Sequence, residues 1–163
     1  MRLKRVPTRR RQSAEMENKR TTLQWLDFDC SIDTEGVLCW DALASPQPGQ
    51  HHGLLQEVAL VLGWAYRLGP QGPGALEDGA DWDFDLQATW LGVGQSPQSP
   101  QAAAVAFDVA TGQMTLSTPT TNGHKEDRRM EDTRKLDRRL ELSLSLSATP
   151  AFAQALREPL DLP

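Results

Sequence analysis

Apolar and polar residues alternate in two neighbouring segments, 26–32 and 38–44, with Asp33-Thr34-Glu35-Gly36 between them. Asp at the first and Gly at the last position favour a type I turn followed by a glycine bulge, which pairs residue 33 with residue 37. Since side chains alternate along a strand, this register gathers only apolar residues on one face of a β-hairpin. That face, which we expect to be buried, consists of Leu26, Phe28, Cys30, Ile32, Leu38, Trp40, Ala42 and Ala44.

Two helices are predicted. Apolar residues recur every three or four positions over 54–68, which is the spacing of one helical face. Gly69-Pro70 follows directly and is typical of a helix end. Near the end of the chain, Thr149-Pro150 has a capping residue followed by a proline suited to the first turn, so a short helix is expected over 151–157.

Alternation predicts four further strands, with a turn at Thr111-Gly112-Gln113 between the second and third of them. They cover 81–91, 103–109, 114–118 and 140–146. The resulting order is β-β-α-β-β-β-β-α, with short connections between consecutive strands. We therefore predict an α+β fold: a mostly antiparallel sheet of about six strands, with the long helix packed on one face and a short C-terminal helix.

Charge divides the chain into distinct parts. The chain has 163 residues, of which 39% are hydrophobic and 24% charged, values typical of one globular domain. Residues 1–20 contain eight Lys or Arg and only a few scattered apolar residues that could anchor them to a core, so we interpret them as a disordered basic arm. Met16 is an alternative start within this arm. Residues 21–163 form the predicted single α+β domain, interrupted by a charged loop at 120–139.

The predicted domain is strongly acidic. Residues 21–124 contain twelve Asp or Glu but only one basic residue, Arg67, although the net charge of the whole chain is only −5. Such a body should repel nucleic acid and attract cationic partners. No apolar stretch is long enough for a membrane segment, no secretory signal is evident, and the two cysteines form no disulfide framework. We therefore expect a soluble, cytoplasmic protein; its oligomeric state is left open.

The second face of the hairpin carries the candidate binding residues. In the predicted register Asp29 lies directly opposite Asp41, an arrangement that costs stability. Asp83 and Asp85 would extend the same face if their strand neighbours the hairpin. An apolar or aromatic anchor ringed by charge is a frequent interface composition, so we interpret this face as a docking site for a basic protein. Its predicted residues are Trp25, Asp27, Asp29, Asp41, Leu43, Asp83 and Asp85.

The leading hypothesis is a non-catalytic interaction protein of the inhibitor or immunity type, without a cofactor. Its histidines and cysteines lack the spacing of catalytic or zinc-binding motifs, and Asp29-x-Ser31-x-Asp33 fails as a calcium loop because Thr34 stands where glycine is needed. One alternative is a divalent-metal-binding protein or metal-dependent enzyme that uses the Asp cluster. Another is an RNA-associated protein that uses the basic arm.

Overall fold

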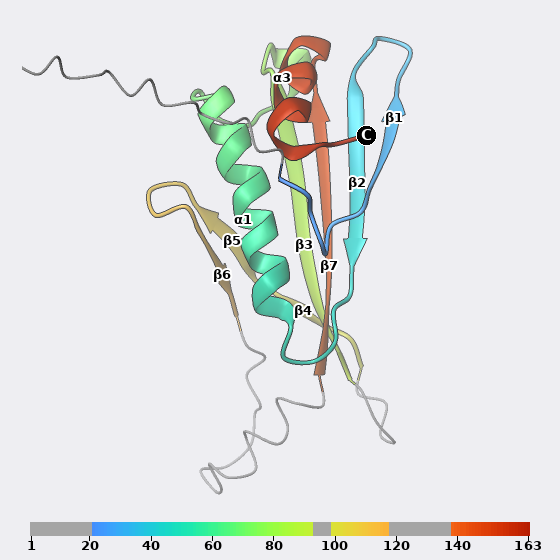
Figure 1. Ribbon diagram of the computed structural model, residues 1–163, viewed down its shortest axis with the longest axis vertical. Coiled ribbons are helices and arrows are strands. Elements are labelled where there is room, and N and C mark those ends of the chain that lie inside the picture. Colours follow the sequence, from blue (N-terminus) through green and yellow to red (C-terminus); the bar gives the residue numbers. More distant parts are fainter. Residues whose placement is uncertain (1–20, 93–98, 118–137) are drawn as a thin grey trace, which may run out of the picture.

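The protein is described by a computed structural model over residues 21–92, 99–117 and 138–163 (Figure 1). The predicted arm 1–20 and the predicted loop up to residue 137 lie outside these residues. The helical elements are α1 (His51–Leu68), the short 3-10 helix η1 (Leu76–Asp78) and α3 (Pro150–Leu160). The strands are β1 (Phe28–Ile32), β2 (Leu38–Ala44), β3 (Trp82–Gly92), β4 (Gln101–Ala103), β5 (Val105–Asp108), β6 (Gln113–Leu116) and β7 (Arg138–Ala148).

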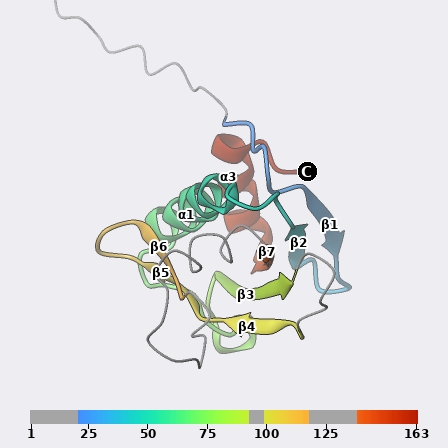
Figure 2. The same cartoon turned by 90° about the horizontal axis from the view of Figure 1, so that it is seen from below.

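The described part of the chain confirms an α+β fold built on antiparallel strands. Five strands form the main sheet in the order β1-β2-β7-β3-β4, and β5 and β6 form a separate hairpin. The sheet curves around α1 and α3, which lie on its concave side, while the β5–β6 hairpin flanks α1 (Figure 2). No described helix covers the convex side, and none is long and apolar enough to cross a membrane.

The strand that comes last in the chain is central in the sheet. β7 pairs with β2 on one side and with β3 on the other. Its leucines at 140, 142, 144 and 146 are at most 2% exposed and lie under the helices, whereas its serines point to the convex side. This alternation fits a strand with a single covered face. β7 begins at Arg138, two residues before the predicted start.

The predicted register of the first hairpin is confirmed. Asp29 pairs with Asp41, and the Asp33 backbone N–H donates to the carbonyl of Val37. Gly36 has φ +85°, a conformation that glycine adopts without the steric cost of a side chain. The Asp33 carboxylate also accepts from the backbone N–H groups of Glu35 and Val37, so the turn is held by both its backbone and its first side chain.

The predicted buried face of this hairpin is only partly correct. Leu26 and Phe28 are buried, but Cys30 is exposed and Ile32 is 64% exposed. β1 is the outermost strand, so it has only one neighbouring strand. From α3, the Arg157 side chain reaches Cys30, where its Nη2 lies 3.5 Å from Sγ, but it does not bury the strand. Alternation gave the correct face, but it could not show how far the covering layer reaches.

The run predicted as one strand at 103–109 is divided in two. β4 pairs with β3, after which the chain leaves the main sheet at Ala104. Ala104 N donates to Ser117 Oγ, and its carbonyl accepts from Ser117 N, each at 2.8 Å. The β5–β6 hairpin therefore packs beside α1 rather than extending the sheet. The turn before Gln113 is confirmed, with Gly112 at φ +68°.

The two helices close the core against the sheet. α1 starts at His51, three residues before the predicted start, and its C-cap is Gly69 as predicted. A β-carbon on Gly69 would lie 2.5 Å from Nε1 of the buried Trp82, so only glycine fits there. Trp82 also stacks on Phe152 of α3, with ring centroids 5.6 Å apart. α3 is longer than predicted, and Thr149 occupies its N-cap without a side-chain capping bond.

Candidate partner-binding face

The convex side of the main sheet carries a continuous row of polar residues across four strands. The row runs from Asp29 on β1 through Asp41 on β2 and Ser145 on β7 to Asp85 on β3, each residue paired with the next. The adjacent row follows the same order of strands. It consists of Ser31, Cys39, Ser147 and Asp83. We call these two rows, with Leu43, the acidic face. The predicted site residue Asp27 is exposed but precedes β1, and it lines a hollow beside the C-terminal residues Leu160 and Leu162.

Hydrogen bonds organise only part of the acidic face. Ser145 Oγ donates to Asp41 Oδ1 at 2.5 Å, and Gln87 Nε2 donates to Asp85 Oδ2 at 2.6 Å. Asp29 is exposed, and no described side chain pairs with its carboxylate. Asp29 and Asp41 therefore face each other as like charges. The only hydrogen bond to either carboxylate from a described side chain comes from the neutral hydroxyl of Ser145 on β7. Such a pair is destabilising within the isolated chain, and a cation placed over it would relieve the repulsion.

Trp25 does not belong to this face, so its predicted place is wrong. The chain before β1 turns toward α1, where a β-carbon on Gly53 would lie 2.7 Å from Trp25 Nε1. Both oxygens of Glu57, on α1, hold the turn. Oε1 accepts from Gln24 N at 2.5 Å, and Oε2 accepts from Trp25 N at 2.8 Å and from Leu26 N at 3.1 Å. Trp25 does not follow the alternation of β1, because the strand begins only at Phe28.

Leu43 is the apolar residue that remains on the acidic face. Its side chain is 66% exposed, and only three other large hydrophobic side chains among the described residues are exposed. Its partner across the strands is Ser143, so a small side chain lies beside it and leaves room above the sheet. Of the two apolar residues predicted for this face, Trp25 and Leu43, only Leu43 is exposed on it.

Sequence reasoning missed the serines of β7. Ser143, Ser145 and Ser147 separate the carboxylates of the β1–β2 hairpin from those of β3, because β7 lies between these strands. The alternation of Leu and Ser over 140–146 indicates a polar side, but it does not show that this side joins two acidic strands. Small side chains at the centre make the face shallow, with the carboxylates at both flanks.

The arrangement does not favour a metal site. Neighbouring strands lie about 4.8 Å apart, so Asp41 and Asp85 are separated by roughly 10 Å of backbone across β7. Ligands of one Ca²⁺ ion must converge to about 2.5 Å from it. Among the described residues, no group of three or more His, Cys, Asp or Glu could hold a metal ion. His51, in addition, packs edge-on against Trp90 and takes no part in such a cluster.

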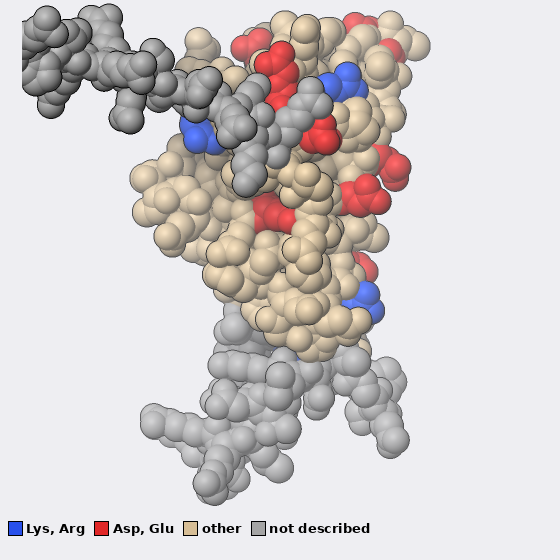
Figure 3. Space-filling model, viewed as in Figure 1, with Lys and Arg blue, Asp and Glu red and all other residues tan. Residues whose placement is uncertain are grey.

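The described part of the chain as a whole carries an excess of acidic residues. The described residues include fifteen Asp or Glu and four Lys or Arg. The helix-covered side is mostly uncharged, with acidic side chains at its centre, along its top and toward the edge formed by β1 and β2 (Figure 3). On the convex side, Arg139 lies at the far end of β7, where its guanidinium donates to the Ser45 carbonyl. The middle of the acidic face thus contains carboxylates and hydroxyls.

Comparison with protein-family models, with curated proteins and with solved structures finds no match for this chain.

Proposed function

We propose that this protein is a non-catalytic binding protein that docks a basic protein surface on its acidic face, in the manner of an inhibitor or immunity protein. The observation that carries the proposal is the row Asp29, Asp41, Ser145 and Asp85, which crosses four strands on a side that no described helix covers. Lys or Arg side chains of a partner would pair with the flanking carboxylates, and Leu43 would supply an apolar contact.

A bound cation would relieve an electrostatic repulsion on the acidic face. The Asp29–Asp41 pair is unfavourable in the free protein, so a bound cation gains attraction to both carboxylates and also removes their repulsion. The excess of acidic residues over the described part of the chain would speed the encounter with a cationic partner and make its rate fall with added salt. The metal-binding alternative receives no comparable support from the described residues. The RNA-binding alternative depends on the arm 1–20, which lies outside them.

The test is a charge-matched comparison on a partner that co-purifies with the tagged full chain. One variant combines Asp29→Asn, Asp41→Asn and Asp85→Asn on the acidic face. The control combines Glu77→Gln, Asp78→Asn and Glu158→Gln, which removes the same three charges from η1 and α3. We expect the first variant to bind the partner at least about tenfold more weakly, and the control to lose less than about threefold.

A second variant separates apolar contact from charge. Leu43→Ser should weaken binding by about tenfold or more if the exposed leucine is an anchor of the interface. Its effect should persist at high salt, whereas that of the triple aspartate variant should shrink as ions screen the charges. A partner that binds both triple variants equally tightly would show that docking does not use the acidic face.

A further inference from the structure

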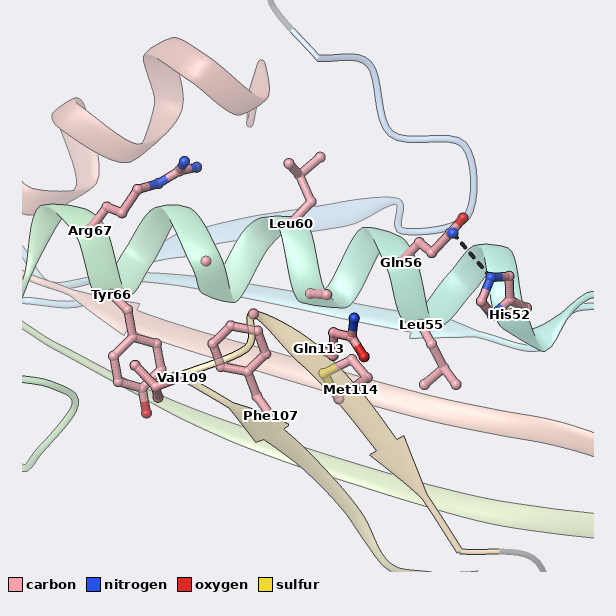
Figure 4. Close-up of a pocket in the computed structure, with 13 residues that line it drawn as sticks. His52, Leu55, Gln56, Leu60, Tyr66, Arg67, Phe107, Val109, Gln113 and Met114 are labelled. Atoms are coloured by element: carbon pink, nitrogen blue, oxygen red, sulfur yellow. Dashed lines mark hydrogen bonds between the residues drawn. The ribbon is translucent and has the colours of Figure 1, made fainter.

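A separate cavity lies on the helix side of the molecule, away from the acidic face. It is a trough of about 760 Å³ that runs along the exposed side of α1, beside the β5–β6 hairpin. Tyr66, Phe107 and Met114 line it on the side of the hairpin, and Leu60 and Arg67, which project from α1 away from the hairpin, form the opposite rim (Figure 4). His52 and Arg67 mark its two ends, fifteen residues apart on α1, which corresponds to a length of about 22 Å.

Two small residues of α1 line the trough. Ala59 and Gly63 are one turn apart on the same side of the helix. A β-carbon on Gly63 would meet no atom within 4 Å, so no described packing requires glycine there. Glycine inside a helix costs about 1 kcal/mol relative to alanine. Glycine at this position leaves the helix backbone open to an occupant of the trough.

The charge of the trough differs from that of the rest of the protein. None of its lining residues is acidic, and Arg67 is the one Lys or Arg among them. The Arg67 guanidinium lies 3.9 Å from the centroid of the Trp64 ring, and no described acidic side chain pairs with it. Stacking fixes the plane of the guanidinium while its N–H edge remains able to bind a carboxylate in bidentate fashion.

The size of the trough decides the class of occupant. Stable protein–protein interfaces use about 20–30 residues on each side, and thirteen residues line the trough. Its volume falls within the range of small-molecule sites, about 300–1,000 Å³. We infer that the trough binds a single-chain amphiphile with an anionic end group, such as a fatty-acid-like carboxylate, whose chain lies along Ala59 and Gly63 and whose head group meets Arg67. This inference is independent of the proposed function.

The experiment is calorimetric titration of the full chain with octanoate, decanoate and dodecanoate, each below its micelle concentration. Affinity should rise about fourfold for each methylene buried, which is the gain for transfer of one such group out of water. Arg67→Gln should weaken dodecanoate by about tenfold and leave dodecanol unchanged, because the alcohol has no charge to pair with Arg67. Gly63→Leu should weaken both ligands by at least about tenfold, because its side chain fills the trough.

Two further variants guard against misreading a folding defect or general surface adsorption. Val109→Asp places a charge at the exposed lip of the trough and should also abolish dodecanoate binding. Gln154→Leu adds an apolar side chain on the exposed side of α3 and should leave binding unchanged. The proposal is overturned if the wild-type chain binds none of the three carboxylates. It is equally overturned if Gly63→Leu and Val109→Asp, both folded, bind dodecanoate as tightly as wild type, or if Arg67→Gln affects acid and alcohol alike.

Discussion

The Glu57 carboxylate provides the sharpest stability test, because it joins α1 to the chain that leads into the acidic face. It accepts three backbone N–H groups, from residues 24, 25 and 26, just before β1 begins. No strand partner is available to these donors, since pairing of β1 with β2 starts at Phe28. Without Glu57, the donors of the half-buried Trp25 and the buried Leu26 would lose their acceptor.

The magnitude follows from those two bonds. A hydrogen bond to a charged group contributes about 1.5–3 kcal/mol, and water can replace the bond of the exposed Gln24. Glu57→Ala should therefore lower the free energy of unfolding by about 3 kcal/mol. Glu57→Gln retains one carbonyl acceptor and should lose about half as much. Urea denaturation followed by tryptophan fluorescence measures both values.

The neighbouring residue supplies the control. Gln56 is exposed, and its side chain bonds only to His52, so Gln56→Ala should change stability by less than about 0.5 kcal/mol. If Glu57→Ala lost no more than this control, the carboxylate would not hold the turn, and the placement of Trp25 beside α1 would be in doubt. If it lost the full amount, Asp27 would also be expected to become more mobile, because the same turn positions it.

Two further predictions concern other parts of the fold. Gly63→Ala should raise the free energy of unfolding by about 0.5–1 kcal/mol, because the new methyl group enters open space. Gly53→Ala should instead lower the free energy of unfolding by about 1–3 kcal/mol, because its methyl group would clash with Trp25. Equal effects of the two substitutions in thermal melts would contradict this difference in packing. Bonds from the Thr111 hydroxyl, and then from the Ala110 and Thr111 backbone N–H groups, hold the pKa of Asp108 below its usual range. The stabilisation is therefore present above the unfolded-state pKa and is lost as pH falls through the folded-state pKa. Asp108→Asn should be less stable than wild type at neutral pH and equal to it in strong acid, and a difference that does not vary with pH in urea titrations would refute this.

Local patterns in the sequence determined much of the fold. The turn at Asp33–Gly36 fixes the register of the first hairpin, because turn chemistry and one buried face leave a single compatible pairing. The period of α1, its end at Gly69, and the alternation in β3 and β7 also depend on neighbours along the chain. The pairing of Asp29 with Asp41 follows from that register and needed no tertiary information.

The order of strands in space was decided only by the tertiary structure. Alternation shows that β7 has one apolar side, but every antiparallel partner offers the same backbone hydrogen bonds, so the sequence does not select β2 and β3 as its neighbours. The continuous row from Asp29 to Asp85 depends on that choice. The trough likewise depends on the chain leaving the sheet at Ala104, where two bonds with Ser117 turn β5 toward α1. Trp25 lies beside α1 because its backbone N–H bonds to Glu57, a residue far away in the chain. Ile32 is exposed because the covering layer does not reach the end of the outermost strand. Local periodicity encodes neither of these effects.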